Sequence, residues 1–168
     1  MHGQAETEVA RPRRSELDRI DRFILRTLQE EGRITNVELA RRAGLTAPPC
    51  LRRVRALEQA GIIRGYHADI APEAVGWPVT VFAFVSLKSQ AEDDLRAFEA
   101  YVASLPEVRE CHMLSGETDF LLRIVARDLP GFQAFLSGKL TTAPNVASVK
   151  TSLTLRTSKT EVGVPVEV

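Results

Sequence analysis

The strongest constraint on the fold of this chain is a change in hydrophobic periodicity near residue 71. Before it, apolar residues recur every three or four positions, beginning at Leu17 and Ile20, which is the spacing of amphipathic helices. After it comes a nearly continuous apolar run, "VTVFAFVSL" at residues 79–87, which is typical of a buried strand. The sequence therefore predicts a helical part followed by an α+β part.

The formal charge changes sign between the same two parts. Residues 11–67 carry 13 arginines and 7 acidic residues, a net charge of +6, whereas residues 68–168 carry 9 basic and 13 acidic residues, a net charge of −4. A basic N-terminal part is suited to a polyanionic partner, but a solvated surface also holds arginines without touching a phosphate. The positions of the arginines on the helices decide between a polyanion-binding surface and an ordinary solvated one.

Three short helices are predicted in the N-terminal part. The first begins at Ser15, which resembles the start of a capping box, and ends at Gly32. The second begins at Thr35 with an S/T-x-x-E pattern and ends before Gly44. The third lies within "GLTAPPCLRRVRALEQAG", residues 44–61, and its C-terminal glycine is a common helix end.

The segment after the third helix, "IIRGYHADI" at residues 62–70, has strand composition on both sides of Gly65. We therefore predict a short β-hairpin there, or a strand pair that packs on the helices. Two helices joined by a glycine-containing turn and followed by a hairpin match the winged helix-turn-helix plan of DNA-binding proteins.

The third helix is predicted to have one buried and one outward face. At ~100° per residue, Cys50, Val54 and Leu57 fall within a narrow arc, and Arg52 and Arg55 lie on the opposite side. Arginines in this position can donate to guanine in the major groove, and the other arginines are candidates for phosphate contacts. The predicted DNA-contacting residues are Thr35, Arg41, Arg42, Thr46, Ala47, Pro48, Pro49, Arg52, Arg53, Arg55 and Arg64.

Two adjacent prolines shape the entry to this helix. Pro48 and Pro49 have no N–H group, so the Thr46 side chain cannot cap the helix by accepting from either of them. The residue before a proline is biased away from the helical region, so the helix is predicted to begin at Pro48 or Pro49. The Thr46 hydroxyl is then available for a DNA phosphate.

The second part alternates strands and helices in the order βαββαβ. This order is the ferredoxin-like arrangement, an antiparallel sheet with both helices on one face. The other face is apolar enough to predict a homodimer that pairs two sheets. The predicted regions of the chain are a disordered arm (1–14), a winged helix-turn-helix domain (15–70), a linker (71–78), the ferredoxin-like domain (79–156) and a tail (157–168).

The sequence predicts no metal site, no membrane span and no signal peptide. Cys50 and Cys111 lie far apart and outside any metal-binding spacing, so both are interpreted as small core residues and neither a metal nor another cofactor is expected. The longest apolar run is too short for a bilayer span, and "MHGQAETEVARPRR" has no signal-peptide core. We therefore expect a cytoplasmic protein with no membrane partner.

Three stretches in order resemble the Lrp/AsnC, or feast/famine, family of bacterial and archaeal transcription factors. They are "LDRIDRFILRTLQEEGRITNVELARRAGL", "CLRRVRALEQAGIIRGYHADI" and "SGETDFLLRIV", and the likeness extends over residues 15 to about 156. The resemblance implies a nucleoid-associated regulator that binds double-stranded DNA at pseudo-palindromic operators. It also implies a homodimer that assembles further, to a tetramer or octamer.

The resemblance further implies a small amino acid effector bound between dimers at a Gly-x-x-Asp turn, here Gly116 to Asp119. Backbone N–H groups at such a turn can hold the carboxylate of an amino acid, and Asp119 can pair with its ammonium. Which amino acid binds is left open. The implied effector-binding residues are Met113, Leu114, Ser115, Gly116, Glu117, Thr118 and Asp119.

Two other functions are alternatives to a ligand-responsive regulator. One is an architectural DNA-binding protein that responds to no effector. The other is a small ferredoxin-like enzyme, since Cys111, His112, Ser115 and Asp119 are close in sequence. Adjacent strand residues point to opposite faces, and no base is placed to activate Ser115. The chain is therefore not expected to be an enzyme.

Overall fold

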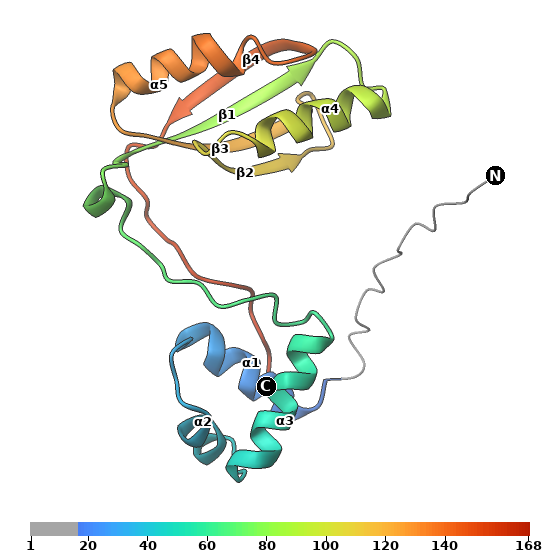
Figure 1. Cartoon of the computed structure of the whole chain (residues 1–168), viewed down its shortest axis with the longest axis vertical. Helices are drawn as coiled ribbons and strands as arrows, with labels where there is room; N and C mark the ends of the chain where they lie inside the picture. The colour runs from blue at the N-terminus through green and yellow to red at the C-terminus, as the bar shows by residue number, and fades with distance from the viewer. Residues whose placement is uncertain (1–16) are drawn as a thin grey trace, which may run out of the picture. The chain divides into compact units, whose positions relative to one another are not determined.

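The computed structural model describes residues 17–168, which divide into two units (Figure 1). The first unit contains residues 17–68 together with Thr160–Val168, and the second contains Asp69–Lys159. The predicted arm at residues 1–14 lies outside the described residues. No helix within the described part is both long enough and apolar enough to cross a lipid bilayer.

The first unit contains the three predicted helices packed around one core. They are α1 (Arg19–Glu30), α2 (Asn36–Arg42) and α3 (Ala47–Gln59). The predicted stripe of α3 supplies Cys50 and Leu57, both buried, and Val54, which packs at the edge. The buried residues of this core are Ile24, Leu39, Ala40, Cys50 and Leu57.

Helix α1 begins at Arg19, so the prediction that it begins at Ser15 is wrong. Its N-cap is Asp18, whose Oδ1 accepts from Asp21 N at 2.8 Å, while Asp21 Oδ2 accepts from Asp18 N at 3.3 Å. This reciprocal capping box satisfies two N–H groups at the helix start. Ser15 itself lies outside the described residues.

Helix α3 begins at Ala47, so the prediction that it begins at Pro48 or Pro49 is wrong by one or two residues. Its N-cap is Thr46, and the Thr46 side chain makes no capping hydrogen bond, as the two prolines predict. Asn36 Nδ2 donates to Ala47 O at 2.9 Å, which ties the start of α3 to the start of α2. This bond helps to hold Ala47 in the helical region despite the proline that follows.

The segment 62–70 contains no strand, so the predicted hairpin is wrong. The N–H groups of residues 62–63 both donate to Leu57 O, at 3.0 and 3.1 Å, and complete the end of α3. Tyr66 Oη donates to Glu58 Oε1 at 3.0 Å. The first two N–H groups of the segment therefore complete α3 and are not available to a partner strand.

The second unit has the predicted βαββαβ order (Figure 1). The elements are β1 (Val79–Leu87), α4 (Glu92–Ala103), β2 (Val108–Met113), β3 (Phe120–Ala126), α5 (Leu129–Phe135) and β4 (Val146–Leu153). The strands form one antiparallel sheet in the spatial order β2-β3-β1-β4. A π-helical turn at Leu136–Leu140 extends α5, and a short 3₁₀ helix at Pro72–Val75 precedes the sheet.

The two faces of this sheet differ in burial. Alternate residues of β1 and β3 are buried in a single core with residues of both α4 and α5, so both helices cover the same face. The intervening residues, including Phe82, Phe84 and Leu121, are only half-buried. One face therefore forms the core of the unit, and the other has no covering element within the described chain.

Cys111 is exposed, whereas Cys50 is buried. The prediction that both cysteines are core residues is therefore wrong for Cys111. Its strand, β2, lies at the edge of the sheet and is mostly exposed, and Cys111 lines a hollow beside α4. Partial burial nevertheless raises the pKa of the Cys111 thiol to about 11, so the thiol is protonated at neutral pH and is a poor nucleophile.

Removal of one of the largest core side chains tests this packing. Phe98 is fully buried, and its ring centroid lies 4.8 Å from that of Phe120. We expect Phe98→Ala to lower the free energy of unfolding by about 3–5 kcal/mol in a urea titration. Leu155→Ala, at a side chain that is 92% exposed, should change it by less than about 0.5 kcal/mol. Equal effects of the two substitutions would contradict this core.

Candidate functional site

The outward face of α3 presents arginines that no other described residue engages. Burial of Cys50 and Leu57 turns Arg52 and Arg55 to the surface, where both are exposed. Among the described residues, no ion pair includes either of these two guanidinium groups. They can therefore donate to an external acceptor without breaking a bond inside the protein.

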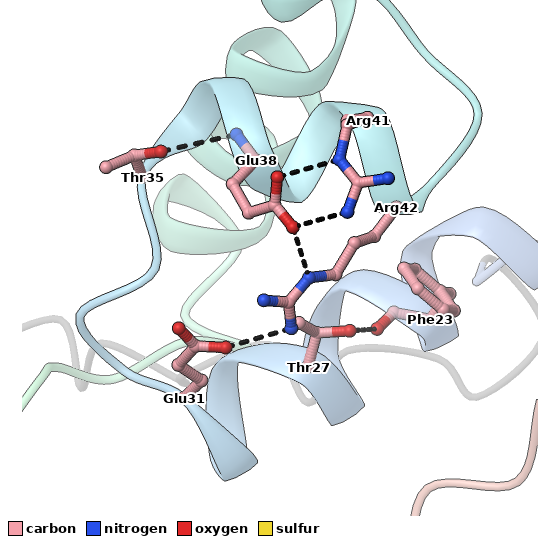
Figure 2. A network of polar contacts seen from close by, with 7 residues as sticks. All are labelled: Phe23, Thr27, Glu31, Thr35, Glu38, Arg41 and Arg42. Carbon is pink, nitrogen blue, oxygen red and sulfur yellow. Dashed lines mark hydrogen bonds and ion pairs between the residues drawn. The ribbon is translucent and has the colours of Figure 1, made fainter.

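The arginines of α2 are engaged by carboxylates (Figure 2). Arg41 donates through Nη2 and Nε to the two oxygens of Glu38 at 2.7 and 2.8 Å. Arg42 bridges Glu38 and Glu31, at 2.8 and 2.9 Å. The hydrogen bonds from Arg41 and then Arg42 lower the pKa of Glu38 to about 2, so Glu38 is ionised near neutral pH. Thr35 caps the same helix, because its Oγ1 accepts from Glu38 N at 3.2 Å.

Arg53 lies on α3 between the two outward arginines but has a different environment. Its Nη1 donates to Asp18 Oδ2 at 2.7 Å and to Asp21 Oδ1 at 2.8 Å. A backbone hydrogen bond from Asp21, together with Arg53, holds the pKa of Asp18 below its usual value. Arg53 therefore joins α3 to the capping box of α1.

The other predicted DNA-contacting residues lie at the two ends of α3. Thr46 and Pro48 are exposed at its start, where Ala47 and Pro49 are half-buried, and Arg64 is exposed beyond its end. Sequence reasoning missed Asn36, which positions the start of α3 through the Ala47 carbonyl. This bond joins two helices across a turn, and no local pattern predicts it.

The predicted effector turn connects β2 to β3. Met113, Ser115, Gly116 and Glu117 are exposed, and Leu114 and Thr118 are half-buried. Within the described chain, the backbone N–H groups of residues 115–118 have no hydrogen-bond acceptor. The turn therefore offers several free donors to an anionic group.

Asp119 is buried and is engaged inside the unit. Its Oδ2 accepts from Leu87 N at 2.7 Å, and its Oδ1 accepts from Gln90 Nε2 at 2.8 Å. The pairing of β1 with β4 shifts register between Ser86 and Leu87, which leaves the Leu87 N–H for this carboxylate. Sequence reasoning missed Gln90, which lies in the loop before α4 and has no recognisable motif.

Each of the two units matches a known protein family. Residues 17–64 match a family model described as winged helix-turn-helix DNA-binding, and residues 80–164 match the Lrp/AsnC ligand binding domain. A leucine-responsive regulatory protein of Rhizobium meliloti is 56% identical over 87% of this chain and 94% of its own length. The Bkd operon transcriptional regulator of Pseudomonas aeruginosa is 42% identical over 84% of this chain and 93% of its own. These relatives are transcriptional regulators rather than enzymes.

Solved structures lead to the same group of proteins. A transcriptional regulator from Neisseria meningitidis, determined as a complex with L-Met, has a TM-score of 0.84 and 41% identity, over 89% of this chain and 96% of that one. AsnC of Escherichia coli has a TM-score of 0.80 and 31% identity, and the match covers 89% of this chain and 99% of that one. The likeness includes the helical unit and the sheet unit.

The ion pairs of Arg53 predict a difference between two neighbouring arginines. Arg53→Ala should lower the free energy of unfolding by up to about 1 kcal/mol, because a partly exposed ion pair contributes in this range. Arg52→Ala removes no internal bond and should leave it unchanged. Urea titration of both variants gives the comparison, and equal stabilities would show that Arg53 does not stabilise the contact between α1 and α3.

Proposed function

Since this chain belongs to the Lrp/AsnC family of DNA-binding transcriptional regulators, we propose that it binds a pseudo-palindromic operator as a homodimer with α3 in the major groove. The observation that carries this proposal is the outward face of α3, where Arg52 and Arg55 have no partner among the described residues. A free guanidinium can make a bidentate contact with guanine, and each such contact discriminates by about 1–3 kcal/mol.

We propose a phosphate-contacting role for most of the surrounding residues. The Thr46 hydroxyl is exposed and free of capping, and the Thr35 hydroxyl retains its proton for donation because it only accepts in its cap. Arg41 and Arg42 share Glu38, so a phosphate would compete with that carboxylate for them. Positioning contacts of this kind orient a protein on DNA without reading its sequence. The wider set of proposed DNA-contacting residues also includes Ala47, Pro48, Pro49, Arg53 and Arg64.

The proposed dimer forms through the uncovered face of the sheet. Phe82, Phe84 and Leu121 are half-buried there, and an apolar sheet face of this kind is well suited to pairing with a second copy. Further assembly to a tetramer or octamer is part of the same proposal. We also infer that the protein works in the cytoplasm at the nucleoid, because double-stranded DNA is its proposed partner.

The proposed effector is a small amino acid bound at the turn between β2 and β3, where dimers meet. The free N–H groups of residues 115–118 support a site for its carboxylate, and the L-Met complex of the Neisseria meningitidis relative supports the ligand class. Asp119 still has unused lone pairs, since a carboxylate can accept about four hydrogen bonds. Its charge would attract the ammonium, and Met113 and Leu114 suit an apolar side chain.

Selection from a random double-stranded DNA library tests the DNA-binding proposal. We expect enrichment of two inverted half-sites about one helical turn, roughly 10 base pairs, apart. Arg52→Ala and Arg55→Ala should each weaken binding to the enriched site by about 1–3 kcal/mol. Arg33→Ala, a matched loss of charge in the same unit, should not. Tight, salt-dependent binding without an enriched sequence would instead favour an architectural protein.

Asp119→Asn tests the effector site with little change to the fold. The asparagine oxygen can accept from Leu87 N, and a rotated Gln90 amide can accept from its NH₂ group. We therefore expect near-wild-type unfolding and DNA binding, but at least about a tenfold loss of amino acid affinity, because a charge-assisted contact is lost. A thermal-shift screen of the twenty amino acids would identify the ligand for this measurement. An undiminished response in Asp119→Asn would exclude the proposed ammonium contact.

A further inference from the structure

The segment Thr160–Val168 follows the sheet unit in sequence but belongs to the helical unit. Val164 N donates to Gln29 Oε1 at 2.8 Å, and Gln29 Nε2 donates to Val164 O at 3.0 Å. A single side-chain amide on α1 thus pairs with both backbone groups of one residue, as a neighbouring strand would. Figure 1 shows this end of the chain, in red, reaching α1.

The residue before Val164 is in a conformation and a close contact that both favour glycine. Gly163 has a φ of +77°, which favours glycine, and a Cβ at this position would overlap Gln29 Oε1. Conformation and close approach therefore both favour glycine. The left-handed φ of Gly163 is independent of the two hydrogen bonds, whereas the close approach belongs to the same contact with Gln29.

The contact continues along α1 beyond Gln29. Val166 is half-buried, and Val168 lines a hollow with Ile20 and Phe23 of α1. Arg19, Arg26 and Arg42 surround the same hollow. The segment also contains Glu161 and Glu167, so its charge complements the basic unit on which it lies.

We propose that the segment Thr160–Val168 is a strap that connects the DNA-binding unit to the regulatory unit a second time and thereby narrows the range of operator spacings that a dimer accepts. The chain leaves the helical unit after Ala68 and returns to it at Thr160. With the strap docked, two chain segments restrain the helical unit, and with the strap released, only one does. This inference rests on the proposed dimeric binding of DNA.

The physical reason is the loss of freedom that a second connection imposes. A unit held by one chain segment samples many orientations, so its recognition helix can meet half-sites at several distances and rotational phases. A second connection removes many of those orientations. Two linked binding modules engage together only at geometries that their connections permit. The docked strap should therefore favour one spacing and disfavour its neighbours.

Three variants should release the strap by different routes. Gln29→Ala removes both hydrogen bonds. Gly163→Val adds a side chain that overlaps Gln29 at a residue with a left-handed backbone conformation. A chain ending at Lys159 lacks the strap. The matched controls are Glu30→Ala, next to Gln29 on α1, and Val162→Ala, at an exposed strap residue. If all three releasing variants change DNA binding in the same way, the change is due to release of the strap and not to local damage at one position.

Amide hydrogen exchange of the full chain without DNA tests the docking itself. The Val164 amide should be protected in the wild-type protein and in both controls, and it should lose most of that protection in Gln29→Ala and Gly163→Val. Wild-type exchange as fast as that of an unstructured peptide would overturn the proposal, whatever the DNA experiments show. This measurement does not depend on the proposed regulatory function.

Binding to a series of duplexes tests the role of the strap. The duplexes carry two selected half-sites whose separation increases by single base pairs over a full helical turn. Wild-type affinity should vary by about tenfold or more across the series, and the three releasing variants should flatten this variation to about threefold. A protected Val164 with identical spacing profiles in all variants would overturn the strap's role. If no duplex binds the wild-type protein while Val164 is protected, the proposed operator binding has failed, and the strap's role with it.

Discussion

The burial of one stripe of α3 is the constraint on which the DNA-binding unit depends. Cys50 and Leu57 are packed against a core that includes Ile24 of α1, and their burial turns the opposite side of the helix outward. The hydrogen bond from Asn36 to Ala47 holds the start of α3 relative to α2. The direction of Arg52 and Arg55 is a consequence of this packing, because side chains of a helix share its rotation.

The five arginines of α2 and α3 fall into two groups according to their partners. Arg41, Arg42 and Arg53 pair with carboxylates of the same unit, and they contribute to its structure as well as to its charge. Arg52 and Arg55 have no such partner in the described chain. The net positive charge of the unit therefore overstates the number of guanidinium groups that are free to bind DNA.

The sheet unit separates its core from the turn between β2 and β3 in a similar way. Both helices cover one face, and the turn between β2 and β3 lies at the end of two strands. Asp119 ties that turn to β1 and to the loop before α4, through Leu87 and Gln90. A ligand at the turn would therefore act on groups that already connect three parts of the unit.

Local patterns in the sequence were sufficient to predict the three helices, the βαββαβ order and the outward face of α3, because periodicity and capping depend on neighbouring residues. They failed for the hairpin at 62–70 and for Cys111, where a helix end and an edge strand decided the outcome. Only the tertiary structure decided that Arg53 pairs with the α1 capping box, that Asp119 is engaged by Gln90, and that Gly163 lies against Gln29. These contacts join residues far apart in the chain, so folding rather than sequence spacing brings them together.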